Sequence, residues 1–234
     1  MINQKRLIKS FKKLVCIDSL SLKEGKIIAV IERELRAIGL NPQIVGKPDG
    51  AECGSLAVNL PGRGCKGPAI LLNAHVDTVA PGNSVKPIEK KGYILSKDKT
   101  ILGADNKAGV AAIIEILRVL KERKLTHPPL QVIFTIAEEI GLIGASTLDP
   151  KVLHAEYGIV VDGGDIDKIV DKAPSQINIT AKIIGRSAHA GIHPEDGIHA
   201  IKAASEAVAK MKLGRIDKET TANIGIIKLS LIHI

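Results

Sequence analysis

Aromatic side chains are scarce in this sequence, which has no tryptophan, two tyrosines and two phenylalanines among its 234 residues. Apolar residues nevertheless make up 45% of the chain, so a sizeable core can form, and that core must be aliphatic. The length allows one large domain, or one domain with part of a second. With so few aromatic rings, the chain also has little on which to stack unpaired bases, which argues against a single-stranded nucleic-acid binder.

The sequence has an excess of positive charge, with a net charge of +8 and an isoelectric point near 9.3. Such a balance suits a polyanionic partner when the basic residues gather on one patch. Here the lysines are scattered along the chain. We therefore interpret them as a solvated basic surface and expect no nucleic-acid partner.

Cysteine pairs and long apolar runs are also missing. Cys16, Cys53 and Cys65 are odd in number and form no Cys-x-x-Cys motif, which indicates reduced thiols. No apolar run approaches the roughly 18 to 20 residues of a membrane span. The first residues are polar and rich in lysine, unlike a secretion signal. We expect a cytoplasmic protein with no membrane partner.

Helical and strand-like patterns alternate along the first 172 residues. Apolar residues at helical spacing predict helices, and short apolar runs bounded by turn residues predict buried strands. The expected helices span residues 3–18, 23–38 and 110–120, and the expected strands lie within 42–60 and end near 75, 137 and 161. This order predicts an α/β fold with a mostly parallel sheet and flanking helices.

The pattern changes after about residue 172. Residues 176–184 alternate between apolar and polar, as in a half-exposed antiparallel strand. A helical pattern at 197–211 and a strand pattern at 221–228 follow. We therefore predict a first domain over residues 1–172 and a smaller, incomplete α+β domain over 173–234.

Ionisable residues follow the predicted strands. His75 and Asp77 come at the end of one apolar run and point to the same face, because alternate residues of an extended chain share a face. This spacing suits a metal ligand whose imidazole is oriented by a carboxylate. An isolated His-x-Asp is more often a polar strand end, so the argument depends on the other acidic positions.

Three more acidic positions complete the pattern. Glu138 and Glu139 follow the next apolar strand, Asp162 follows a third, and Asp105 stands at the start of a helix. Asp105 also occupies the position of a helix N-cap, and both roles are compatible. Parallel strands bring such residues to one edge of the sheet. One histidine among several carboxylates suits Zn²⁺, Co²⁺ or Mn²⁺, and Asp105 could bridge two ions.

These motifs together resemble a known family. His75-Val-Asp77, Gly103-Ala-Asp105-Asn-Lys-Ala-Gly109, Glu138-Glu139 and Asp162, in this order, resemble the M20 family of co-catalytic metallopeptidases, in its peptidase T-like (tripeptide aminopeptidase-like) branch. The resemblance covers nearly the whole chain. It implies a zinc exopeptidase-like fold, two Zn²⁺ ions per site, and hydrolysis of short peptides from their N-terminus. It also implies a homodimer formed through the second domain, which acts as a lid.

The resemblance implies a role for each motif residue. His75 and Asp162 would bind one metal ion, Glu139 the other, and Asp105 both. Asp77 would orient His75, and Glu138 would be the general base. In the lid, His189 of Gly185-Arg-Ser-Ala-His189 resembles the histidine that stabilises the oxyanion, often from the partner subunit.

The sequence also departs from the family pattern. Asn106 stands where many relatives have a second aspartate, and the chain ends at Ile234, within the lid. A further histidine ligand of the second metal is missing, and His233 is poorly placed to replace it. We therefore expect a C-terminally truncated chain with reduced or no activity. The alternative is a non-catalytic binding or dimerisation fragment. A nucleotide-binding protein would need a glycine-rich phosphate loop, which the sequence lacks.

Overall fold

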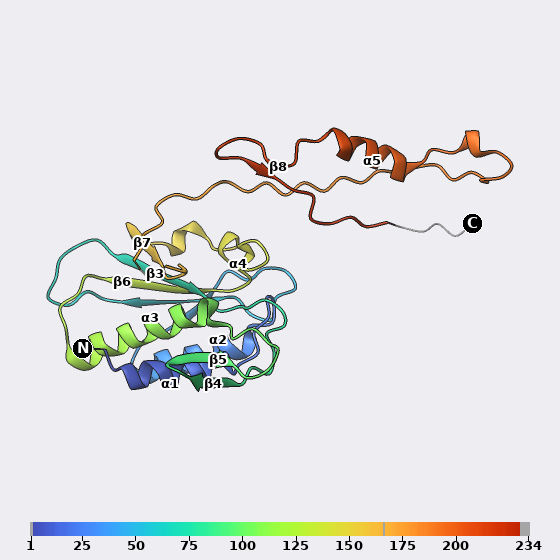
Figure 1. Ribbon diagram of the computed structural model, residues 1–234. Helices are drawn as coiled ribbons and strands as arrows, with labels where there is room; N and C mark the ends of the chain where they lie inside the picture. The colour runs from blue at the N-terminus through green and yellow to red at the C-terminus, as the bar shows by residue number, and fades with distance from the viewer. Residues whose placement is uncertain (1, 166, 230–234) are drawn as a thin grey trace. The chain divides into compact units, whose positions relative to one another are not determined.

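The computed structural model describes residues 2–165 and 167–229, so His233 lies outside the described residues. The chain forms two units, Met1–Lys168 and Ile169–Ile234 (Figure 1). Each unit is described by itself below. All of the acidic positions predicted to follow strands, and His75, belong to the first unit.

A five-stranded sheet organises the first unit, with the strand order β1-β2-β6-β3-β7 (Figure 1). Strand β3 pairs in parallel with β6 and β7, whereas β2 is antiparallel to both β1 and β6. Four of the five strands therefore run in the same direction, which confirms the predicted mostly parallel sheet. The strands are β1 (Gln43–Val45), β2 (Ser55–Leu60), β3 (Ile70–His75), β6 (Leu130–Thr135) and β7 (Tyr157–Val160).

The three long helices of this unit lie on one face of the sheet (Figure 1). They are α1 (Gln4–Val15), α2 (Gly25–Ala37) and α3 (Ala104–Arg123), and the short α4 (Ile143–Ser146) lies on the other face. The helix α2 ends before Gly39, whose φ of +74° suits the left-handed residue that follows many helices. A separate hairpin pairs β4 (Pro87–Lys90) with β5 (Tyr93–Ser96), and η1 (Pro150–Val152) is one 3₁₀ turn.

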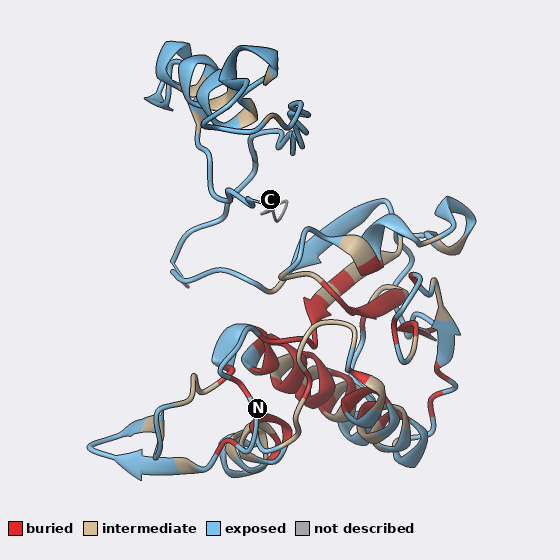
Figure 2. Cartoon of the chain, turned by 90° about the vertical axis from the view of Figure 1, so that its right-hand side faces the viewer, coloured by how far each residue is buried: buried red, intermediate tan, exposed pale blue. Residues whose placement is uncertain are grey.

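The core between the sheet and the helices is aliphatic, as the composition predicts. Figure 2 shows its buried residues on the inner strands and along α3. Every residue of β6, the middle strand of the sheet, is buried. Phe134 and the partly buried Phe11 are the aromatic residues that pack in the core. Residues that are fully buried there include Leu14, Ile27, Ile31, Ile113 and Val132.

The second unit contains less regular structure than its sequence pattern predicts. It has α5 (Ala200–Lys210), the 3₁₀ turn η2 (Pro194–Asp196), and a short ladder of β8 (Gly214–Arg215) with β9 (Thr221–Ala222). The strands predicted at 176–184 and over most of 221–228 do not form. An extended segment becomes a strand only where a neighbour takes its hydrogen bonds. Without one, Ile179 and Ile226 are 86% and 77% exposed.

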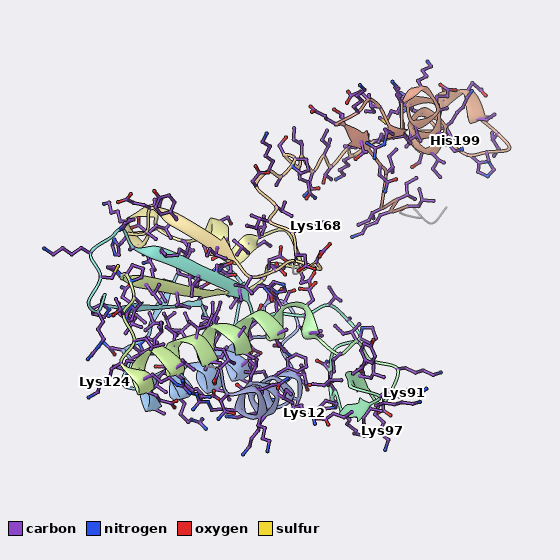
Figure 3. The ribbon with its side chains drawn as sticks, turned by 60° about the vertical axis from the view of Figure 1, so that its left-hand side comes forward. Lys12, Lys91, Lys97, Lys124, Lys168 and His199 are labelled. Carbon is purple, nitrogen blue, oxygen red and sulfur yellow. The ribbon has the colours of Figure 1, made fainter. Side chains whose placement is uncertain are left out.

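Lysines are spread over the first unit rather than collected on one face. Figure 3 labels Lys12 on α1, Lys91 and Lys97 at the hairpin, and Lys124 after α3. This distribution agrees with a solvated basic surface. Among the described residues, no helix has both the length and the apolar character needed to cross a membrane.

A buried carboxylate joins α1 to α3. Glu115 on α3 is 1% exposed, and its oxygens accept hydrogen bonds from Arg6 Nε at 2.7 Å, Arg6 Nη2 at 2.9 Å and the Asn3 N–H at 3.0 Å. Burial by itself would raise the pKa of Glu115, but the bonds from Arg6 and Asn3 outweigh burial and lower it. The folded-state pKa is therefore below the unfolded one. This contribution to stability is present above the unfolded pKa and is lost as the pH falls through the folded pKa.

We predict that Arg6→Ala lowers the free energy of unfolding by about 1–3 kcal/mol at pH 7, because it leaves a buried carboxylate without its main partner. The measurement is urea unfolding. The matched control is Arg36→Ala, which removes an exposed pair with Glu32 and should cost under about 1 kcal/mol. The difference between the two variants should shrink in acid, when Glu115 is protonated. Equal losses at pH 7 would contradict the role given to Arg6.

Candidate metal centre

The C-terminal end of β3 places His75 beside the ends of its two neighbours. The pairing of β3 with β6 runs as far as His75 opposite Thr135, and its pairing with β7 ends at Asn73 opposite Val160. Residues that follow β6 and β7 therefore emerge next to the imidazole. This is the edge at which parallel sheets form their sites.

The two ring nitrogens of His75 have different partners. Nδ1 lies 3.2 Å from Asp77 Oδ1 and 3.1 Å from the Asp77 backbone oxygen, while Nε2 lies 3.0 Å from Asp105 Oδ1. His75 is 2% exposed, so packing holds the ring in this orientation. The side of the ring away from Asp77 thus faces the other carboxylates.

Asp77 also holds the turn that follows β6. Its carboxylate accepts the N–H of Glu138 at 3.0 Å, the N–H of Glu139 at 3.1 Å and the hydroxyl of Ser21 at 2.7 Å. Asp77 is fully buried, and burial by itself would raise its pKa; the bonds from His75 and these three donors outweigh burial and lower the pKa. Asp77 is therefore an anion that fixes both His75 and the backbone of the two glutamates.

Asp105 does not cap the helix, contrary to the expectation from its position. Asp105 and Asn106 have non-helical backbone angles, and regular α3 geometry begins after them. The cap is Asn106, whose Oδ1 accepts the N–H of Gly109 at 3.2 Å. Because Asn106 takes this role, Asp105 is free to direct its 73% exposed side chain toward His75.

A glycine brings α3 close to the segment that carries Asp162. A Cβ at Gly109 would lie 2.4 Å from the backbone oxygen of Val161, so any larger residue would push the two segments apart. Val161 in turn donates its N–H to the Asn73 oxygen at 2.8 Å, which continues the β7 pairing by one residue. The next residue, Asp162, has Oδ2 at 3.7 Å from His75 Nε2.

One imidazole and four carboxylates therefore meet at this edge of the sheet. His75, Asp105 and Glu139 offer ligand atoms within 4.8 Å of one another, and so do His75, Glu138 and Asp162. The four residues predicted as ligands, His75, Asp105, Glu139 and Asp162, all belong to these groups. Glu138, predicted as the base, lies among them, with Oε2 at 3.9 Å from His75 Nε2.

Crowding of negative charge shifts the pKa values of these groups. Burial and the charges of Asp105 and Glu138 raise the pKa of Asp162 to about 6, although His75 opposes the change. Burial and the charge of Asp105 likewise raise the pKa of Glu139. Burial by itself would lower the pKa of His75, but Asp77, Asp162 and Asp105 raise it to about 9. A cation relieves this repulsion, and oxygen and imidazole donors suit Zn²⁺, Co²⁺ or Mn²⁺.

The remaining predicted residue, His189, belongs to the second unit. It is exposed, and its Nδ1 accepts the N–H of Gly191 at 3.2 Å. Its role at the oxyanion stays a prediction.

Sequence reasoning missed residues that support the site, among them Ser21 and Lys107. Ser21 bonds Asp77 from 56 positions away, and nothing local indicates that contact. Lys107 is 1% exposed, donates to the Ile17 oxygen at 2.8 Å, and has its pKa lowered by burial to about 8. The sequence signal for this burial was the position of Lys107, two residues after Asp105 and at the start of a strongly apolar helix.

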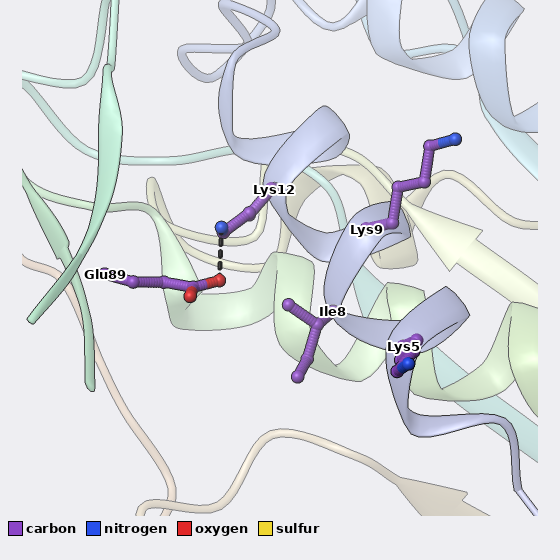
Figure 4. A pocket seen from close by; sticks show the side chains of 5 residues that line it. All are labelled: Lys5, Ile8, Lys9, Lys12 and Glu89. Atoms are coloured by element: carbon purple, nitrogen blue, oxygen red, sulfur yellow. Dashed lines mark ion pairs between the residues drawn. The ribbon is translucent and has the colours of Figure 1, made fainter. Parts of the chain in front are cut away.

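A surface hollow elsewhere on the first unit has different chemistry. Figure 4 shows Lys5, Ile8, Lys9 and Lys12 of α1 with Glu89 of β4, where Lys12 and Glu89 form an ion pair. Two basic groups of the hollow, Lys5 and Lys9, have no acidic partner within it, and no histidine lines it. The carboxylate cluster around His75 therefore remains the candidate active site.

Comparisons with known proteins agree with this geometry. The sequence model of the M42 glutamyl aminopeptidase family matches residues 93–186, and that of the peptidase dimerisation domain matches residues 174–229. The chain is 45% identical to the uncharacterized protein YqjE of Bacillus subtilis over 228 residues, which cover 96% of this chain and 61% of YqjE.

Two crystal structures are similar in sequence and in fold. The aminopeptidase PepT from Bacillus cereus is 38% identical with a TM-score of 0.74, and the match covers 96% of this chain and 61% of PepT. A tripeptidase from Staphylococcus aureus is 37% identical with a TM-score of 0.79, over 97% of this chain and 61% of the tripeptidase. The chain thus spans about 61% of the length of these relatives. Sequence motifs, fold and relatives together support an M20-type peptidase of the peptidase T-like branch.

Proposed function

We propose that this chain carries the dinuclear metal centre of a peptidase that releases N-terminal residues from short peptides. The observation that carries the proposal is the convergence of His75 with four carboxylates at the C-terminal edge of the sheet. The substrate class is supported by the relatives, which include an aminopeptidase PepT and a tripeptidase. Because the chain spans 61% of their length, the activity proposed is that of the whole protein.

The resemblance to the M20 metallopeptidases suggests how two ions would be held. His75 and Asp162 would bind one ion, Glu139 would bind the other, and Asp105 would contact both. The 3.0 Å approach of Asp105 to His75, and its membership of a group with Glu139, support the bridging role. Zn²⁺ is the expected ion, with Co²⁺ and Mn²⁺ as alternatives. When bound, such ions lower the pKa of water to about 7 and polarise a carbonyl group.

Glu138 is proposed as the general base. Its half-buried carboxylate lies among the ligand residues, while its backbone N–H is fixed by Asp77. A carboxylate held at this position can take a proton from the attacking water and pass it to the departing amine. Asp77, through its bond to Nδ1, leaves Nε2 of His75 as the nitrogen that binds an ion.

The second unit is proposed to serve as a lid and dimerisation module. The match of residues 174–229 to the peptidase dimerisation domain supports a homodimer. The exposed His189 would donate a hydrogen bond to the oxyanion that forms during peptide hydrolysis. A cytoplasmic location also remains a prediction.

We predict that Glu138→Gln and Glu139→Gln have different consequences in the whole protein. Glu138→Gln should keep its metal and lose about 10²–10⁴-fold in kcat, because it removes only the base. Glu139→Gln should weaken metal binding by more than the roughly 10–100-fold typical of residues that merely support ligands. Metal content after dialysis and hydrolysis of a tripeptide measure the two effects. If both variants lose metal equally, the two glutamates do not divide these roles.

We predict that metal binding releases about one proton from His75 at pH 7. Its pKa of about 9 means that the metal-free ring is protonated at pH 7, and only the neutral ring can bind an ion. Affinity for Zn²⁺ should therefore rise roughly tenfold per pH unit up to about pH 9 and then level off. Calorimetry in buffers of different ionisation enthalpy counts the proton.

The control for this measurement is His75→Ala, which should lose both the tight binding and the proton release. Removing metal with a chelator should abolish peptide hydrolysis, and Zn²⁺ or Co²⁺ should restore it. A metal affinity that does not change between pH 7 and pH 9 would contradict the assignment of His75 as a ligand.

A further inference from the structure

The segment between α1 and α2, residues 16–24, supports the site from within the core. We name it the α1–α2 loop. It is hydrogen-bonded to the end of β3, to the start of α3 and to the turn after β6. Two bonds reach the end of β3: Ser19 Oγ donates to the Val76 oxygen at 2.9 Å, and Ser21 Oγ donates to Asp77 Oδ2 at 2.7 Å. The bond to the start of α3 is donated by Lys107 Nζ to the Ile17 oxygen at 2.8 Å.

Glu24 makes the connection to the turn after β6. It is fully buried, and its Oε1 accepts the N–H of Leu22 and the N–H of Ala137, both at 2.9 Å. Its Oε2 has no hydrogen-bond partner among the described residues. A buried carboxylate is costly unless its bonds offset the loss of water. The bonds of Glu24 are concentrated on one oxygen, which joins two segments 113 residues apart.

Both residues bonded to this oxygen have an unusual backbone conformation. Leu22 has a φ of +70° and Ala137 a φ of +49°, in the left-handed region that side chains with a Cβ rarely adopt. Such a conformation costs about 1–2 kcal/mol and persists where surrounding contacts impose it. The hydrogen bond from the Ala137 N–H to Glu24 is one such contact.

Ala137 directly precedes the two glutamates of the site. Its N–H bonds Glu24, and the next two N–H groups, of Glu138 and Glu139, bond Asp77. Three successive N–H groups are therefore held by two buried carboxylates. Rotation at Ala137 would turn the following peptide units, so Asp77 and Glu24 together determine where the carboxylates of Glu138 and Glu139 point.

We propose that Glu24 is a positioning residue for Glu138 and Glu139, and that it acts as a hydrogen-bond acceptor for Ala137 rather than through its charge. The effect on turnover rests on the proposed function, whereas the hold on the turn does not. Glu24 touches neither the ligand atoms nor the proposed base, so it acts only through the backbone.

Two conservative variants of the whole protein separate the effect of side-chain length at position 24 from the effect of its charge. Glu24→Gln keeps the length of the side chain and an acceptor oxygen but removes the charge. Glu24→Asp keeps the charge but is one methylene shorter, so it cannot stay within hydrogen-bond distance of both N–H groups. The matched control is Glu52→Asp, since Glu52 lies near the same helix start, bonds the Gly25 N–H, and makes no bond to the site.

We expect Glu24→Asp to lower kcat for a tripeptide by about 10–100-fold with a smaller change in KM. Glu24→Gln should stay within roughly threefold of wild type, and Glu52→Asp should be unchanged. Amide hydrogen exchange over residues 136–142 should accelerate in Glu24→Asp and not in Glu24→Gln, because only the shorter residue releases the Ala137 N–H. A residue that merely stabilises the fold would lower the unfolding temperature without changing kcat per folded, metal-loaded site.

Several results would overturn the proposal. Wild-type kcat in a folded Glu24→Asp protein means that Glu24 does not position the base, and equal damage in Glu24→Gln means that charge is what matters. If Glu24→Asp does not fold, adding Ala137→Gly removes the cost of the positive φ, and kcat is then compared with that of Ala137→Gly alone. If the wild-type protein hydrolyses no tripeptide, the proposed function fails. Amide exchange then decides by itself whether Glu24 holds the turn.

Discussion

The geometry of the site depends on the hydrogen bonds that the buried carboxylate of Asp77 accepts. This carboxylate is removed from water, and it compensates for this by bonding the His75 ring, the hydroxyl of Ser21 and the N–H groups of Glu138 and Glu139. An anion buried in this way is stable only while its partners remain in place. The side chain of Asp77 therefore contacts the end of β3, the turn after β6 and the α1–α2 loop at once, and the bond of Glu24 to Ala137 adds to the hold on the turn.

The sheet supplies the coarse geometry that these bonds refine. Because β3 lies between β6 and β7 and runs parallel to both, the segments that follow these three strands leave the sheet at the same edge. Gly109 then allows the first turn of α3 to approach the backbone just before Asp162. Acidic residues from three distant parts of the sequence thus reach His75.

The same convergence concentrates negative charge, which is unfavourable for the fold by itself. Burial, together with this repulsion, raises the pKa values of Asp162 and Glu139, and His75 opposes only part of the change. A bound cation would relieve the repulsion between these carboxylates. Groups with shifted pKa values also gather at functional sites. The similarity to M20-type peptidases and the proposed dinuclear centre are consistent with that physical argument.

The sequence by itself determined the aliphatic core, the α/β order and the placement of His75, Glu139 and Asp162 after strands, because burial and strand ends leave local patterns. The tertiary structure decided the rest. It made Asn106 the helix cap instead of Asp105, brought Ser21 and Glu24 to residues 56 and 113 positions away, and left residues 176–184 without the partner that would make them a strand. Periodicity reports which face of a segment is buried. The partner of a buried polar group, or of an extended segment, depends on which distant residues the fold brings beside it.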